Sequence, residues 1–102
     1  MASRRYGSFQ EFYPFYLTEH SRSGTRRLHF VGTLLVLLTV VYALATRRWV
    51  ALVFLPVFGY GFAWVAHFAV ERNRPATFKY PFYSLVGDFR MFADIARGRI
   101  PF

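Results

Sequence analysis

Three histidines and one glutamate are the residues of this sequence best suited to bind a metal ion. The histidines are His20, His29 and His67, and Glu71 follows His67 four residues later. Residues four apart share a face of an α-helix, so His67 and Glu71 can act as two ligands or as a ligand and its orienting group. The chain has no cysteine, which leaves imidazole and carboxylate ligands that suit iron, zinc, copper or nickel.

These residues fit more than one arrangement. Two histidines and one carboxylate around open positions are typical of ferrous iron sites that react with oxygen, and three histidines alone are an equally open alternative. A structural role is a further interpretation, in which two histidines hydrogen-bond to each other and Glu71 pairs with an arginine. Asn73 and Arg74 fit a helix C-terminal cap better than an anion site, and Asp88 fits a solvated or salt-bridged carboxylate.

Two apolar segments must position the histidines. Residues 30–46 read FVGTLLVLLTVVYALAT and contain no charge, and residues 49–70 read WVALVFLPVFGYGFAWVAHFAV with one histidine. A membrane-spanning helix needs about 20 apolar residues, with a range of about 17–25. Only Arg47 and Arg48 separate the two segments, so we predict an antiparallel hairpin of two spanning helices.

Such a hairpin brings the histidines to a common depth. His29 and His67 lie equally far along the chain from Arg48 at the turn. Because both helices rise by about 1.5 Å per residue, the two side chains are expected to lie level at one end of the hairpin. His20 precedes the first helix at the same membrane face, so the three histidines and Glu71 can converge on one site.

The composition agrees with a small membrane protein. The chain has 102 residues, which suffice for one domain, and 55% of them are hydrophobic and 22% aromatic. Charged residues make up 18%, against about 25% in ordinary soluble domains. Intrinsic disorder requires low hydrophobicity, and disulfide scaffolds and thiolate zinc sites require cysteine, so these classes are excluded.

The net charge of +8 is unevenly distributed. Apart from the two arginines of the turn, all basic residues lie before Phe30 or after Val70, among them Arg4 and Arg5. The positive-inside bias therefore predicts an integral membrane protein with both termini in the cytoplasm, in a bacterial inner membrane or its equivalent. No nucleic-acid recognition module is visible, so we expect no nucleic-acid partner. Two spanning helices bury little surface, so we expect a homo-oligomer.

The predicted fold is an all-α single membrane domain over residues 1–102. Ser8 and Glu11 form a capping-box pattern that begins an N-terminal amphipathic helix. Pro81 can begin a C-terminal helix whose apolar stripe would lie on the membrane or pack over the hairpin. The four helices are expected at residues 8–20, 26–46, 49–72 and 81–97.

Three stretches of the sequence resemble the Mpo-type family of small membrane proteins. They are FYPFYLTEH (Phe12–His20), RRLHFVGT (Arg26–Thr33) and HFAVERNRPATFKYPFYSLVGDFRMF (His67–Phe92). Each histidine stands in the context expected for the family, whereas the apolar segments match only in hydrophobicity. The chain resembles a short form without the additional spanning segments of fungal members, and it has Ala66 where a glycine often precedes the last histidine.

The resemblance implies a chemistry and a set of ligands. Characterised fungal members of the family are Fe(II)-dependent dioxygenases of fatty-acid α-oxidation, which act on 2-hydroxy fatty acids and shorten them by one carbon. Carried over by motif, His20, His29 and His67 are the implied metal ligands. Glu71 and Asn73 match the family pattern after the last histidine and are the further catalytic and substrate candidates.

The implied substrate is amphipathic and would meet O₂ at the cytoplasmic membrane face. Its carboxylate and 2-hydroxyl could chelate the metal, while its acyl chain lies among aromatic side chains or along the bilayer. The expected substrate-binding residues are Arg26, Arg27, Asn73 and Arg74. Zinc is the alternative metal, as in a zinc-dependent lipid hydrolase. The non-enzymatic alternative is a membrane scaffold or lipid-binding protein with structural histidines.

Overall fold

The chain folds into helices, with no strand in the part of the chain that the structure describes. This computed structural model describes residues 6–75 and 79–102, so Arg4 and Arg5 lie outside the described residues. The α-helices are α1 (Phe9–Thr18), α2 (Ser23–Thr46), α3 (Phe62–Val65) and α4 (Pro81–Ala96). A further helix, Trp49–Glu71, is called the second long helix below. It contains α3 together with the 3₁₀ segment η1 (Trp49–Phe54) and the π-helical segments η2 (Val57–Gly61) and η3 (Ala66–Glu71). The predicted all-α class is confirmed.

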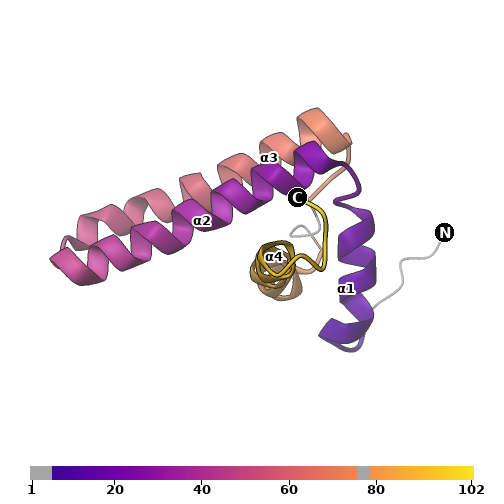
Figure 1. The fold of residues 1–102 in the computed structure, drawn as a ribbon, viewed down its shortest axis with the longest axis horizontal. Coiled ribbons are helices and arrows are strands. Elements are labelled where there is room, and N and C mark those ends of the chain that lie inside the picture. The colour runs from indigo at the N-terminus through magenta and orange to yellow at the C-terminus, as the bar shows by residue number, and fades with distance from the viewer. Residues whose placement is uncertain (1–5, 76–78) are drawn as a thin grey trace.

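The helix α2 and the second long helix are both long and apolar enough to cross a membrane. Their most apolar windows have mean hydropathies of 2.2 and 1.8, and only 22% and 11% of these windows is buried within the fold. Figure 1 shows the two helices side by side, joined by a short turn in which Arg47 adopts a left-handed conformation at φ 58°. Most of their apolar side chains therefore face outward.

A glycine permits the close contact between these two helices. A Cβ atom at Gly32 would lie 2.7 Å from the backbone oxygen of Phe58 and 3.0 Å from the Cβ atom of Phe62. No larger side chain fits here unless the backbone moves. Small residues at the contacts of spanning helices allow such close approach of two backbones.

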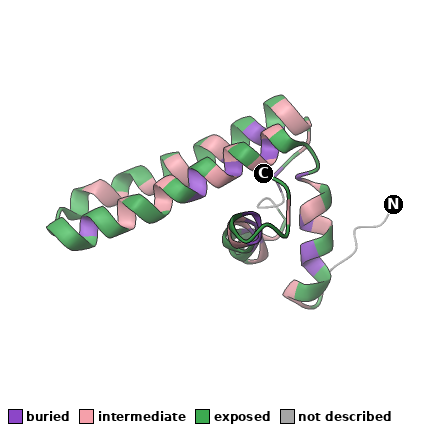
Figure 2. Ribbon diagram, viewed as in Figure 1, coloured by how far each residue is buried: buried purple, intermediate pink, exposed green. Residues whose placement is uncertain are grey.

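The helix α2 and the second long helix together form a rod (Figure 1). The helices α1 and α4 pack together at the end of this rod where α2 begins. Their shared core consists of buried residues from both helices: Phe12, Tyr13, Tyr16, Met91 and Ile95. Figure 2 shows that the far part of the rod is mostly exposed or half-buried. Burial is therefore concentrated at the end of the rod that carries His29 and His67.

The face that α4 turns toward the protein is mixed, since it carries Met91 and Ile95 as well as polar residues. Ser84 and Asp94 are buried, whereas the predicted apolar stripe is 40% to 78% exposed at its residues Phe82, Leu85, Val86 and Phe89. A soluble amphipathic helix would show the reverse arrangement. An outward apolar stripe suits a helix whose surroundings are themselves apolar.

Local hydrogen bonds set the bounds of α1. The Oγ atom of Ser8 accepts from the Glu11 N–H at 3.2 Å, and the Glu11 carboxylate accepts from the Gly7 N–H at 3.0 Å, so the capping pattern is present. The helix ends at Thr18, and the N–H of His20 donates to the Leu17 carbonyl at 3.1 Å. His20 therefore lies beyond the helix, whereas the sequence led us to expect it within a helix over residues 8–20.

A buried carboxylate joins α1 to α4. Asp94 accepts from the Tyr13 hydroxyl at 2.8 Å, from Arg90 at 3.1 Å and from Arg97 at 3.4 Å. Burial acts to raise the pKa of Asp94, but the hydrogen bonds from Tyr13 and Arg90 and the two positive charges outweigh it and hold that pKa below its usual value. The ionised form of Asp94 is therefore the form that fastens the two helices together.

We predict that Gly32→Ala destabilises the pair of long helices by about 1–3 kcal/mol, because the added methyl group must displace backbone. Gly61→Ala is the matched control, since a Cβ atom at Gly61 meets no heavy atom within 4 Å. Thermal unfolding of both variants in detergent measures the difference. Equal Tm values for the two variants would contradict the close contact at Gly32.

We also predict a pH-dependent contribution from Asp94. Because its folded-state pKa is lowered, the stabilisation is complete above the unfolded-state value of about 3.8 and is lost as the pH falls through the lower folded-state pKa. Asp94→Asn should therefore lower the Tm near neutral pH, and its difference from wild type should shrink below about pH 3. Effects of histidine protonation are common to both proteins and cancel in this difference. A Tm difference that stays constant across the pH range would refute the prediction.

Candidate metal centre

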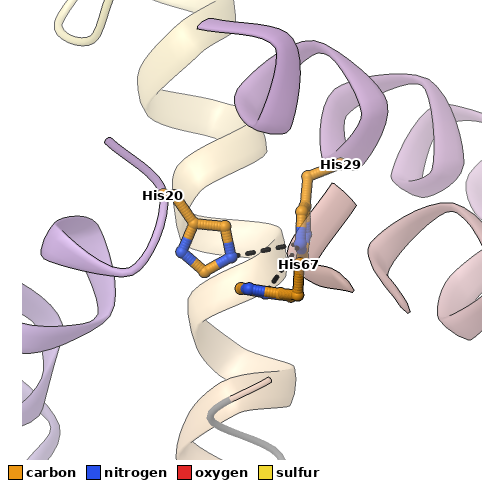
Figure 3. A group of neighbouring side chains, drawn as sticks. All are labelled: His20, His29 and His67. Atoms are coloured by element: carbon orange, nitrogen blue, oxygen red, sulfur yellow. Dashed lines mark hydrogen bonds between the residues drawn. The ribbon is translucent and has the colours of Figure 1, made fainter. Parts of the chain in front are cut away.

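The three histidines come from separate elements and meet at one point (Figure 3). His29 lies on α2, His67 on η3, and His20 in the connection between α1 and α2. All three side chains, called the histidine trio below, are buried, with at most 5% of each residue exposed. The Nε2 atom of His29 lies 3.1 Å from Nε2 of His20 and 3.3 Å from Nε2 of His67.

These spacings match the ligands of a single metal ion. With a metal–nitrogen distance of about 2.1 Å, neighbouring ligand nitrogens lie about 3.0 Å apart in an octahedral site and about 3.4 Å apart in a tetrahedral site. Both Nε2 separations fall between these values, and one nitrogen of each ring lies within 4.8 Å of the other two. The trio can therefore hold one metal ion.

The outer nitrogen of every ring in the trio faces an oxygen acceptor. The Nδ1 contacts are His20 to the Tyr16 carbonyl at 2.7 Å, His29 to the Asp88 carboxylate at 3.4 Å and His67 to the Asn73 side-chain oxygen at 2.7 Å. Carbonyl, carboxylate and amide oxygens accept hydrogen bonds but do not donate them. A ring proton on each Nδ1 atom would be directed at one of these oxygens, and the three Nε2 lone pairs would then point into the trio.

The orientation of the Asn73 side chain follows from a second contact. Its Nδ2 atom donates to the Glu19 carbonyl at 3.3 Å, which leaves Oδ1 directed at His67. The backbone N–H of Asn73 also donates to the His67 carbonyl at 2.9 Å, where the helix ends. Asn73 was predicted as a substrate residue or part of a helix cap, and the structure places it as the group that orients His67.

With a proton on every Nδ1 atom, the three Nε2 lone pairs would repel one another, whereas a proton on one Nε2 atom would make its contact a hydrogen bond, as dashed in Figure 3. A shared proton would relieve the repulsion, but burial and then the nearby His29 and His67 lower the pKa of His20 well below its usual value. A metal cation satisfies all three lone pairs at once. Hydrogen bonds between the histidines, the structural alternative, fit the same two Nε2–Nε2 contacts.

Tyr16 and Asp88 form the support behind the trio. The Tyr16 hydroxyl donates to Asp88, and its ring stacks on His20 with centroids 4.1 Å apart. Burial and then the Asp88 charge raise the pKa of Tyr16 well above its usual value, so the phenol stays protonated and keeps donating. A Cβ atom at Gly87 would lie 2.9 Å from the Tyr16 ring, so glycine is needed where α4 passes this ring. Carboxylates placed like Asp88 orient metal-binding imidazoles.

Glu71, predicted as the fourth site residue, lies outside the trio. Its carboxylate accepts from the Ser21 hydroxyl at 3.0 Å and from the backbone N–H of Arg22. The prediction assumed α-helical spacing, but η3 is π-helical, and its wider turn no longer stacks residue i+4 over His67. Glu71 instead fastens the connection between α1 and α2, which carries His20.

Two of the predicted substrate residues contact the C-terminal segment. Arg26 donates to the Pro101 carbonyl at 2.9 Å, and the Arg27 guanidinium lies 5.1 Å from the centre of the Phe102 ring. Neither arginine lines the small cavity beside the trio. Arg74 lines a shallow surface hollow next to Asn73.

The sequence reasoning did not find the roles of Tyr16, Asp88 and Ser84. Ser84 lines the small cavity beside the trio, and its buried hydroxyl has no hydrogen-bond partner among the described residues. A signal for two of them is present in the sequence: Ser84 and Asp88 are a polar pair with helical spacing, on the side of this helix away from its apolar stripe. Such a pair indicates a face with a specific partner.

A family comparison now bears on this site. A sequence model of the family described as 2-hydroxy-palmitic acid dioxygenase Mpo1-like matches residues 6–100 of the chain. The chain belongs to the Mpo1-like family. The resemblance recognised in three stretches of the sequence is thereby confirmed, and the match includes the trio and the residues that orient it. No curated protein and no solved structure matches the chain.

The Mpo1-like name and the geometry point in the same direction. The name suggests a dioxygenase of 2-hydroxy fatty acids, and the trio is positioned to bind a metal ion. Both observations favour a metal-dependent function over a purely structural role for the histidines.

We predict that the oxygen acceptors behind the trio determine its metal affinity. Asp88→Ala and Asn73→Ala should each weaken metal binding by about 10–100-fold, because a ligating imidazole loses its orienting partner. His67→Ala should abolish tight binding. Titration with Co²⁺, followed by visible absorption and chelator competition, measures these affinities.

Glu71→Gln is the control for this series. Its side chain contacts Ser21 and Arg22 rather than the trio. Because the amide of glutamine can accept from the Arg22 N–H and donate to the Ser21 hydroxyl, the connection that carries His20 stays in place and the variant should bind Co²⁺ as wild type does. A loss of affinity in Glu71→Gln as large as that in His67→Ala would show that Glu71 is a ligand and would contradict the assignment.

Proposed function

We propose that this chain is an Fe(II)-dependent dioxygenase that acts on 2-hydroxy fatty acids and shortens them by one carbon, as in fatty-acid α-oxidation. One observation carries the proposal: one side-chain nitrogen from each of three buried histidines converges within 4.8 Å of the other two. Membership of the Mpo1-like family supports the substrate class and the use of O₂.

Iron is the metal that best fits this reaction. A dioxygenase needs a metal that can change its oxidation state, which zinc does not do. Imidazole ligands suit iron, and three protein ligands leave coordination positions open. When bound, ferrous iron would supply the activation of dioxygen, and the protein would supply binding and orientation.

The chain's own residues would hold the ligands and keep bulk water out. Tyr16, Asp88 and Asn73 keep the ring protons on the outer nitrogens, so all three inner nitrogens stay free to bind metal. The trio is almost fully buried. The carboxylate of a substrate would be attracted strongly to a metal cation bound there, because electrostatic interactions are strong in a buried site. Ser84 can donate to an oxygen of the substrate head, because its hydroxyl lines the same cavity.

We further propose that α2 and the second long helix cross the membrane as an antiparallel hairpin. Their apolar surfaces are largely exposed, and so is the apolar stripe of α4. The sequence places most basic residues on the flanks of the hairpin, which favours a cytoplasmic location for both termini and for the trio. A bacterial inner membrane or its equivalent, with α1 and α4 at the interface, suits this arrangement. The exposed apolar sides of the hairpin would also be available to a second copy in a homo-oligomer.

The test combines metal analysis with product analysis. Protein purified in detergent without oxygen and loaded with ferrous iron should contain one iron per chain. Added 2-hydroxyhexadecanoic acid should cause oxygen uptake and yield an acid one carbon shorter, detected by mass spectrometry. His67→Ala should lose both the iron and the oxygen uptake.

Two controls separate the alternatives. Wild-type protein loaded with zinc should consume no oxygen, and hexadecanoic acid without the 2-hydroxyl should not be a substrate. Lipid hydrolysis by the zinc form would favour a hydrolase instead. A wild-type protein that binds no metal, together with a stable His67→Ala variant, would favour a membrane scaffold.

A further inference from the structure

An apolar groove leads away from the histidine trio. It has a volume of about 260 Å³ and lies between α2, the second long helix and α4. Apolar side chains form most of its walls, among them Val36, Leu55, Leu85 and Phe89. Tyr60 and Asp88 line both this groove and the small cavity beside the trio, so the two spaces adjoin at these residues.

The groove runs from the trio toward the middle of the helix pair. Thr33, which lines the groove, lies about one turn beyond His29 on α2, and Val36 lies about two turns beyond it. A rise of about 1.5 Å per residue places Val36 about 10 Å from His29 along the helix. On the second long helix, Leu55 and Gly59 precede His67 on the side of the turn. The groove thus extends from a polar end into the most apolar part of the molecule.

We propose that this groove binds the part of a fatty acyl chain nearest to its polar head, with the head at the trio. The identity of the ligand rests on the proposed function, whereas the location rests on the groove itself. The polar side chains of the groove, Thr33, Tyr60 and Asp88, lie toward its end at the trio. The buried Ser84 hydroxyl beyond them lacks a partner among the described residues. A molecule with one polar end and one long apolar end matches this distribution.

The groove opens toward the lipid side. Leu85 and Phe89 are 53% and 40% exposed and belong to the outward apolar stripe of α4. A fatty acid dissolved in the bilayer would enter sideways past these residues, and its head would pass between Tyr60 and Asp88. The volume lies just below the range of about 300–1,000 Å³ typical of ligand pockets, so the distal end of a long chain stays outside. Affinity should therefore rise with chain length only until the groove is filled.

Gly59 offers a way to fill the groove. It lines the groove, and a Cβ atom there would meet only Val36, at an ordinary contact distance of 3.7 Å. Gly59→Leu should therefore be tolerated by the helix and occupy the space of the acyl chain. Gly61→Leu is the matched control, because Gly61 is exposed, does not line the groove and has no heavy atom within 4 Å of its Cβ position.

Photolabelling of the metal-free protein tests the assignment without using turnover. The probe is 2-hydroxyhexadecanoic acid with a diazirine in the half of its chain nearest to the head, added to protein in detergent. Mass spectrometry should find the label on peptides that contain Val36, Leu55 or Leu85. Gly59→Leu should reduce this labelling by about tenfold or more, since contacts to several methylene groups are lost, and Gly61→Leu should not.

A second variant and a chain-length series keep the result interpretable. Leu85→Trp narrows the exposed wall of the groove and should reduce labelling even where Gly59→Leu fails to fold. In competition with the probe, short 2-hydroxy acids should bind equally to wild type and Gly59→Leu. Long 2-hydroxy acids should bind more tightly to wild type than to Gly59→Leu.

The outcomes separate this inference from the proposed function. Wild-type labelling outside the groove, or equal labelling of Gly59→Leu and Gly61→Leu, would overturn the groove assignment. So would a changed oligomer mass of Gly59→Leu with unaltered labelling, which would identify the groove as a contact with a second copy. Groove labelling in a protein that turns over no 2-hydroxy acid would support the assignment of the groove and overturn only the proposed dioxygenase activity.

Discussion

Three oxygen atoms behind the imidazole rings decide what the inner nitrogens can do. They belong to the Tyr16 carbonyl, the Asp88 carboxylate and the Asn73 side chain, which come from α1, from α4 and from the segment after η3. Each can accept a ring proton on the outer side, and this arrangement lets the three lone pairs face inward. The remaining architecture serves this constraint, because a displacement of any one of the three segments would free a ring to rotate or change its tautomer.

Two tyrosine–aspartate pairs hold α1 against α4 in the required register. Tyr16 donates to Asp88 near the trio, and Tyr13 donates to Asp94 farther along α4. The rings themselves belong to the core that the two helices share, so the same side chains supply both apolar packing and polar alignment. Gly87 allows α4 to pass close to the Tyr16 ring, which in turn stacks on His20. Packing and ligand orientation are thus physically coupled.

The sequence allowed the trio to be predicted but not its supporting contacts. His29 and His67 could be paired because only their distances from the turn were needed, and the two helices lie side by side. Glu71 could not be placed, because the prediction relied on an α-helical period that η3 does not have. For Asp88 the sequence favoured a solvated or salt-bridged carboxylate, but it could not identify the partner, because His29 is far away in the sequence. The apolar stripe of α4 was recognised, yet periodicity alone does not say whether such a stripe faces protein or lipid.

The π-helical winding of the second long helix bears on how the family's sequences can vary. A π turn is an α turn that accommodates one additional residue, and the chain on either side keeps its direction. A relative with one residue fewer within Val57–Gly61 can therefore close this turn as an ordinary α-helix and still present its histidine at the same place. Alignments that shift by one position in this segment would then describe equivalent structures. For such relatives, the position of the histidine before the helix end identifies the site more reliably than its distance from the turn.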